Sequence, residues 1–185
     1  ELGMGYDVAI LLGNLGANYS MRGDHERGIA LIEEALEQTR EEGDTFGVAV
    51  NLYNLGCYAN DRGDPVAAAG RLREALALVQ SLGELHLASR VVDQVAAALR
   101  LSGKPKPAVR LFAAAAALRE AIGDRPFASE AAELAASYEA AKAVLGEATF
   151  AAAWELGRSL PPGPAIAEAT RLAAALVGVS PAVGD

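Results

Sequence analysis

The chain has 185 residues, which is enough for one domain or a short repeat array with a buried core. Hydrophobic residues make up 52% of it and aromatic residues only 5%, so Ala, Leu and Val dominate the apolar content, which favours packed helices and argues against an all-β fold. The formal net charge of -8 predicts a surface that mostly repels nucleic-acid phosphates and anionic membranes.

Cysteine and histidine are too scarce for redox or metal chemistry. Cys57 is the only cysteine, and His25 and His86 are isolated in the sequence, so we expect no disulfide, no metal site and no cofactor. No apolar run approaches the roughly 20 residues of a membrane span, and the chain opens at Glu1 without an initiator Met or a leader. We therefore expect a cytoplasmic piece of a longer protein, without membrane contact, in which Cys57 is a packed thiol.

A repeat with a period of 40 residues organises the first two thirds of the chain. Residues 14–44 and 54–84 are identical at ten of thirty-one aligned positions, and a weaker third copy follows at the same spacing. The shared motifs are Asn14-Leu15-Gly16 with Asn54-Leu55-Gly56, Arg22-Gly23-Asp24 with Arg62-Gly63-Asp64, and Glu34-Ala35-Leu36 with Glu74-Ala75-Leu76. Because Gly3 lies 40 residues before Gly43, we expect the chain to begin at the end of an earlier repeat.

Each repeat predicts two helices, because its apolar residues recur at helical spacing on either side of a turn. In chain order we expect helices over residues 7–21, 25–42, 46–61, 65–82, 86–102 and 106–122. Asp24, Asp44, Asp64 and Asp124 each follow a glycine. This order predicts that the glycine ends one helix in the left-handed conformation and that the aspartate caps the next helix.

The period lapses after Gly123, so we divide the chain into repeats (1–123) and a C-terminal cap with its tail (124–185). We expect a long helix over 125–145, a shorter one over 147–158 and a last one over 165–177, with Pro161-Pro162-Gly163-Pro164 as the break before the last. The expected apolar side of the long helix consists of Phe127, Ala131, Leu134, Ala135, Tyr138 and Val144. Atypical terminal helices cover the last hydrophobic face of a solenoid.

These positions carry a resemblance to the tetratricopeptide repeat. The family's Leu-Gly falls on Leu15-Gly16 and Leu55-Gly56 of the first helices. On the second helices, its small residue falls on Gly28, Ala68 and Ala108, its bulky residue on Ile32, Leu72 and Phe112, and its late Ala on Ala35, Ala75 and Ala115. The resemblance implies an all-α, right-handed superhelix of about three helix pairs. The family's closing Pro is absent, and a period of 40 in place of about 34 implies helices about one turn longer.

The long period and the closing segment from Tyr138 to Arg158 also resemble the C-terminal regions of bacterial signal-transduction ATPase regulators, including LuxR-type and antibiotic-regulatory activators. This resemblance implies a sensor module at the C-terminal end of a larger transcriptional or signalling regulator.

In such a superhelix the first helix of each pair lines the inner groove, so polar residues that flank each Leu-Gly are candidates for partner binding. They are Asn14, Asn18, Asn51, Tyr53, Asn54, Asn60, Arg90, Asp93, Gln94 and Arg100. Asn is a poor choice for a helix interior but both donates and accepts hydrogen bonds, so its abundance here favours binding. Each residue taken alone is better explained as solvated or as an inter-helix hydrogen bonder, and it is the set that favours binding. The family's chaperone clamp is not expected, because Gly13 and Ala17 replace its Lys and Asn.

We expect no enzyme activity and no catalytic residues, since nothing places a nucleophile beside a base and no phosphate loop occurs. A basic cluster of Arg100, Lys104, Lys106 and Arg110 lacks interleaved aromatic residues, so we expect a solvated loop or a dock for an acidic protein surface, without direct nucleic-acid contact. The sequence thus predicts a module that binds a protein or peptide, which includes another domain of the parent regulator. Two alternatives remain open: a small-molecule inducer bound in the groove, and a passive scaffold.

Overall fold

The computed structural model describes residues 15–16, 18–19, 24–126 and 128–178. Within these ranges it contains eight complete helices and no strand. They are α2 (His25–Glu42), α3 (Thr45–Asp61), α4 (Pro65–Leu82), α5 (Leu85–Leu101), α6 (Pro105–Ile122), α7 (Ala128–Leu145), α8 (Glu147–Arg158) and α9 (Pro162–Val177). Residues 15–16 and 18–19 are also helical, and the rest of the helix predicted over 7–21 lies outside the described residues. The all-α fold class predicted from the sequence is confirmed.

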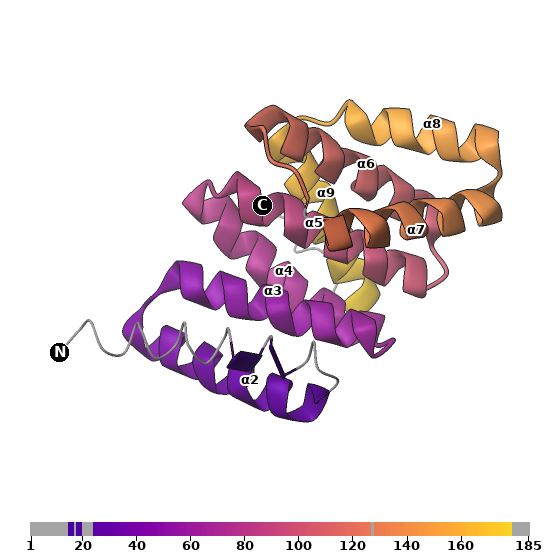
Figure 1. Cartoon of the computed structure of the whole chain (residues 1–185). Coiled ribbons are helices and arrows are strands. Elements are labelled where there is room, and N and C mark those ends of the chain that lie inside the picture. The colour runs from indigo at the N-terminus through magenta and orange to yellow at the C-terminus, as the bar shows by residue number, and fades with distance from the viewer. Residues whose placement is uncertain (1–14, 17, 20–23, 127, 179–185) are drawn as a thin grey trace.

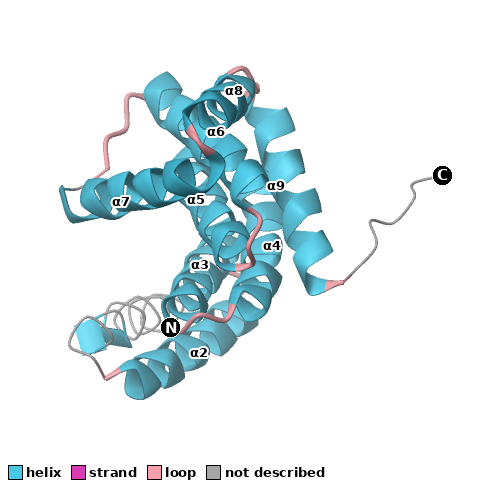
Figure 2. Ribbon diagram, turned by 90° about the vertical axis from the view of Figure 1, so that its right-hand side faces the viewer, coloured by secondary structure: helices cyan, strands magenta, loops and turns pink. Residues whose placement is uncertain are grey.

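Consecutive helices lie side by side in a curved stack (Figure 1). The second view shows the curvature, with α3, α5 and α7 along the inner side and α4 and α6 behind them (Figure 2). Helix α8 packs on α6, while α9 turns back along the outer side and contacts α4, α5 and α6. The C-terminal helices therefore cover two surfaces, since α7 and α8 extend the stack and α9 covers part of its outer side.

Glycine and aspartate build the turns as the sequence predicts. Gly43 and Gly83 end α2 and α4 in the left-handed conformation, with φ of 71° and 67°, which an L side chain rarely adopts. The carboxylates of Asp44 and Asp64 each accept a hydrogen bond of 3.0 Å from the backbone N–H three residues later, which satisfies a donor that the helix leaves unpaired. Asp124 differs, because α7 begins only at Ala128.

The Leu-Gly motif brings the two helices of a pair into close contact. A Cβ added to Gly56 of α3 would lie 2.6 Å from Cδ2 of Leu72 on α4, and one added to Gly16 would lie 2.6 Å from Cγ1 of Ile32 on α2. Leu72 and Ile32 are fully buried, so only a residue without a side chain fits at either glycine. This packing explains why glycine recurs with a period of 40 residues.

Two predictions for the C-terminal helices were wrong. Helix α9 begins at Pro162 and not at 165, because a proline in the first turn lacks only an N–H that has no partner inside the helix. Helix α7 buries a narrower stripe than expected: Leu134 and Tyr138 join the core, whereas Val144 is 73% exposed and Ala131 and Ala135 are also exposed. This helix contacts α6 and α8 along one side, so only that stripe is covered.

Candidate partner-binding groove

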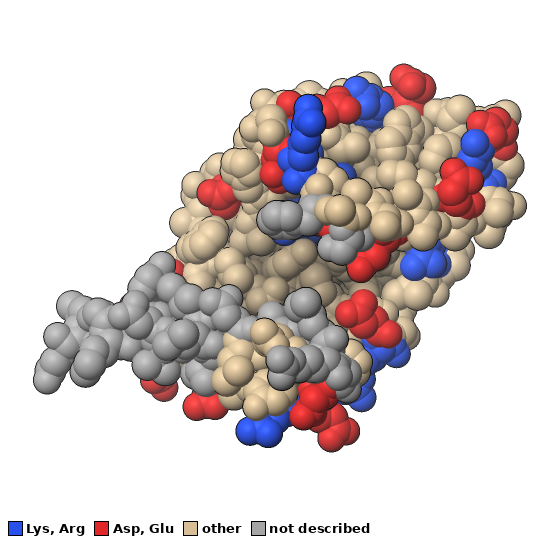
Figure 3. Space-filling view, viewed as in Figure 1, with Lys and Arg blue, Asp and Glu red and all other residues tan. Residues whose placement is uncertain are grey.

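A pocket with a volume of about 290 Å³ lies on the inner side of the stack. We call it the inner pocket. Helix α5 supplies more of its lining residues than any other helix, and the rest come from α3, α7 and, for one residue, α6. The lining residues are Tyr53, Asn60, Asp61, Arg90, Asp93, Gln94, Ala97, Arg100, Leu101, Phe112, Glu130, Glu133, Leu134 and Ser137. In the space-filling view the surface is hollowed in this part of the molecule, with acidic and basic side chains near the hollow (Figure 3).

The structure brings together six of the ten candidate residues. Those that line the inner pocket are Tyr53, Asn60, Arg90, Asp93, Gln94 and Arg100. Asn51 is only 4% exposed inside the stack, and Asn54 is half-buried on α3 outside this lining. Asn18 is exposed, and Asn14 lies outside the described residues. The pocket therefore draws on the end of α3 and most of α5.

Asn60 of α3 is held by α5, the first helix of the next pair. Its Nδ2 donates hydrogen bonds of 2.9 Å to the backbone oxygen of Gln94 and of 2.9 Å to Oε1 of the same residue. Two acceptors fix which end of the amide is the nitrogen. Asn60 Oδ1 then has no hydrogen-bond partner in the described part of the chain, although it is buried.

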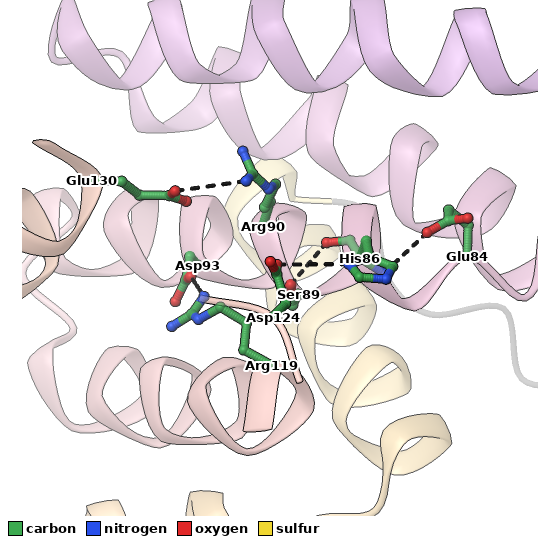
Figure 4. A network of polar contacts seen from close by, with 8 residues as sticks. All are labelled: Glu84, His86, Ser89, Arg90, Asp93, Arg119, Asp124 and Glu130. Carbon is green, nitrogen blue, oxygen red and sulfur yellow. Dashed lines mark hydrogen bonds and ion pairs between the residues drawn. The ribbon is translucent and has the colours of Figure 1, made fainter. Parts of the chain in front are cut away.

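Asp93 of α5 and Arg119 of α6 form an ion pair, with Oδ2 of the carboxylate facing Nη1 of the guanidinium (Figure 4). The two residues are 4% and 5% exposed. Burial raises the pKa of Asp93 to about 7, and the adjacent Arg119 opposes this rise. The second carboxylate oxygen, Oδ1, is buried and has no hydrogen-bond partner among the described residues.

Arg100 contributes a third buried polar atom without a partner. Arg100 lies at the C-terminal end of α5, and its Nε makes no hydrogen bond within the described ranges. An unsatisfied buried donor or acceptor costs about 1–3 kcal/mol, and such groups are few in folded proteins. Three of them, on Asn60, Asp93 and Arg100, line a single pocket.

Helix α7 is tied to α5 at the edge of the pocket. Nη2 of Arg90 lies 3.8 Å from Oε2 of Glu130 (Figure 4). Near the beginning of α5, Nδ1 of His86 lies 3.7 Å from Oδ2 of Asp124, in the connection between α6 and α7. These two contacts link α7, and the connection before it, to α5 beside the pocket.

Tyr53 and Cys57 lie one turn apart on α3, and Tyr53 lines the pocket. Burial raises the pKa of the Cys57 thiol to about 12 and raises that of Tyr53 as well. Cys57 is a free, half-buried cysteine that stays protonated near neutral pH, which agrees with the packed thiol expected from the sequence.

The contribution of α7 to the pocket was missed in the sequence. Glu130, Glu133 and Ser137 line the pocket. From the sequence they were predicted to belong to a C-terminal cap, because the 40-residue period ends before them. Their spacing of three and four residues places them on one face of a helix. Counting helices in pairs would have made α7 the first helix of a fourth pair, and that count was the available signal.

The basic cluster predicted around the third turn is not one patch. Arg100 lines the inner pocket, whereas Nη2 of Arg110 lies 2.9 Å from Oε2 of Glu168 on α9. Lys104 and Lys106 are exposed. Arg100 is therefore separate from the other members of the cluster, whereas Lys106 and Arg110 line one pocket beside α9.

Comparison with known proteins agrees with this architecture. Residues 7–81 match the family described as Tetratricopeptide repeat. The match spans the first two 40-residue copies, and the same alternation of helices continues through α5 and α6. Residues 7–81 are therefore similar to tetratricopeptide repeats, and the packing of consecutive helices from α2 to α6 is typical of their superhelix. Such repeats generally mediate protein–protein interactions. No curated protein and no solved structure shows a significant match to the chain. Among the described helices, none is both long and apolar enough to cross a lipid bilayer.

Proposed function

We propose that this chain is a non-catalytic interaction module that binds a protein or peptide partner along its inner side. The observation that carries this proposal is the inner pocket, where candidate residues from two helices carry three buried polar atoms that have no hydrogen-bond partner among the described residues. A partner's backbone offers N–H and C=O groups that can satisfy such atoms. The stacked repeats hold the pocket on a fixed frame, as binding requires.

We further propose that the module is the sensor segment of a larger bacterial transcriptional or signalling regulator in the cytoplasm. The 40-residue period and the closing segment support this assignment through their resemblance to such regulators. In this proposal residues 1–123 are the repeats and 124–185 the cap, and the partner includes another domain of the same regulator. The net charge of -8 supports a role without direct nucleic-acid contact or membrane binding.

A small-molecule inducer is the second candidate, and the volume of the pocket favours it. At about 290 Å³, the pocket lies near the lower end of the roughly 300–1,000 Å³ of small-molecule sites. A metabolite bound there would raise the melting temperature by mass action. A passive scaffold is the third candidate, and it predicts that substitutions in the pocket leave every binding reaction unchanged.

The test is to select displayed peptides that bind the purified chain and then to measure their binding to variants of the inner pocket and of the outer helices. Gln94→Ala combined with Arg100→Ala removes polar groups of the pocket, while Gln80→Ala combined with Arg171→Ala makes matched changes at exposed positions of α4 and α9. We expect the first pair to weaken binding of selected peptides about tenfold or more, a change of about 1.4 kcal/mol, and the second pair to leave it intact. Peptides that bind both double variants equally well, or the absence of any selected peptide, would contradict the proposal.

A further inference from the structure

The charges that line the inner pocket are unbalanced. Its carboxylates outnumber its guanidinium groups: Asp61, Asp93, Glu130 and Glu133 against Arg90 and Arg100. Arg90 lies next to Glu130 at 3.8 Å, and Arg119 approaches Asp93 from outside the lining. Glu133 stands on α7 at the edge of the pocket and forms no ion pair with any described residue. With Asp93 set against Arg119 and Glu130 against Arg90, Asp61 and Glu133 remain against Arg100, so the pocket presents an excess of one negative charge, which favours a cation.

Hydrogen-bonding capacity points in the same direction. Asn60 Oδ1 and Asp93 Oδ1 are both acceptors, and both residues are more than nine-tenths buried. A guanidinium carries five N–H donors in a planar fork and no acceptor, so one group can reach several oxygens at once. Tyr53 and Phe112 also line the pocket, and aromatic faces attract a guanidinium. The lining therefore suits an arginine side chain better than an anion or an apolar side chain.

The remaining polar atom distinguishes a peptide from a free cation. Arg100 Nε is a buried donor, which a guanidinium has no acceptor to satisfy. A peptide that carries the guanidinium also brings backbone carbonyl oxygens, and one of these can accept from Nε. A pocket of about 290 Å³, at the lower limit of small-molecule sites, also has room for one side chain of a larger partner.

We propose that the inner pocket binds the arginine side chain of an extended peptide, with Asn60, Asp93 and Glu133 receiving the guanidinium and Arg100 contacting the peptide backbone. This inference rests on the function proposed above and specifies its partner. Electrostatic recognition of this kind also selects against acidic segments, since like charges would then be forced together.

The test compares three pools of nonapeptides that differ only at a fixed central residue, which is arginine, citrulline or glutamate. Citrulline keeps the shape of arginine but carries no charge. Binding to the full chain is measured by fluorescence polarisation at low ionic strength, where charge contributes most. We expect the arginine pool to bind at least tenfold more tightly than the citrulline pool, and the glutamate pool to bind most weakly.

Variants of the chain test whether the inner pocket produces this preference for arginine. Glu133→Gln removes one exposed carboxylate of α7, and Glu139→Gln makes the same change on the same helix outside the lining. We expect the preference for arginine over citrulline to fall several-fold in Glu133→Gln and to persist in Glu139→Gln. Asp93→Asn is a second variant, and its circular dichroism is compared with that of the parent because the residue also pairs with Arg119. A final arm uses N-acetyl-arginine amide, which we expect to bind at least a hundredfold more weakly than the arginine pool.

The outcomes separate the two proposals. If the three pools bind equally well, the chain remains a peptide-binding module but the arginine site is refuted. If no pool binds, the proposed function fails together with this inference. If the preference survives in Glu133→Gln as fully as in Glu139→Gln, the arginine binds elsewhere. If N-acetyl-arginine amide binds as tightly as the arginine pool, the pocket is a small-molecule site and the peptide proposal is overturned.

Discussion

Asp93 and Arg119 form a buried ion pair that joins α5 to α6 beneath the inner pocket. One oxygen of the Asp93 carboxylate faces the guanidinium, and the other, which has no partner among the described residues, is the one that we propose to contact a bound peptide. Removing only one member of such a pair leaves a charge buried in a poorly solvating environment.

Arg119→Met is therefore expected to lower the free energy of unfolding by up to about 3–5 kcal/mol at mildly alkaline pH, where the carboxyl group of Asp93 is ionised in the parent. Urea denaturation followed by far-ultraviolet circular dichroism measures this change. Arg71→Met is the control, since Arg71 lies 3.5 Å from Glu33 in an exposed pair that contributes less than about 1 kcal/mol. Similar losses in the two variants would show that burial of the Asp93–Arg119 pair carries no special cost.

The carboxyl group of Asp93 is expected to titrate far above an ordinary aspartate. Burial raises its pKa from 3.8 to about 7, so between these values the folded chain binds a proton that the unfolded chain has lost. The contribution of this group to stability is therefore present below pH 3.8, falls as the pH rises and is lost above about 7. Carbon-13 nuclear magnetic resonance of aspartate carboxyl groups measures the pKa, with Asp93→Asn to assign the signal. A midpoint below 4 for the signal that disappears in this variant would contradict the account.

Two glycine substitutions are expected to act in opposite directions. Gly56→Ala places a Cβ 2.6 Å from the side chain of Leu72, which is fully buried, so overpacking is expected to cost about 1–3 kcal/mol. Gly70 lies inside α4, and a Cβ there would meet nothing within 4 Å. Gly70→Ala is therefore expected to stabilise the chain by about 0.5–1 kcal/mol. Thermal and urea unfolding of both variants check the signs, and the same sign in both would refute the close-packing explanation of the Leu-Gly motif.

Cys57 is expected to react slowly with thiol reagents in the folded chain. Burial raises the pKa of its thiol from 9.0 to about 12, and only the thiolate attacks such reagents. At pH 8 a shift of this size reduces the reactive fraction about a thousandfold relative to the unfolded chain. The rate of reaction with and without denaturant measures the ratio. A ratio below about ten would contradict the burial of this thiol, and Cys57→Ser identifies any signal from other groups.

The fold was predictable because its determinants are local and repeat. Gly43, Gly83 and Asp64 specify turns through their own backbone and side-chain preferences, so helix boundaries between residues 25 and 122 were predicted to within about one residue. The start of α9 was not, because Pro162 can either end a helix or open one. Sequence alone does not decide between these uses.

The site was predictable only in part, since it depends on contacts between distant segments. Register along α3 and α5 identified Asn60, Gln94 and Arg100. No local pattern indicated that α7 would close the pocket or that Arg119 would reach Asp93 from the second helix of its pair. The buried polar atoms that lack a partner among the described residues result from the three-dimensional packing of all these groups. A linear sequence pattern does not contain this packing.

The most direct test of the central claim is to map a bound peptide by nitrogen-15 chemical-shift changes in the full chain. If the inner side binds partners, the largest changes induced by a selected peptide will lie in α3, α5 and α7, with Asn60, Gln94 and Arg100 among the most affected residues. Changes concentrated on α4, α6 and α9 would place the binding surface on the outer side and contradict the account.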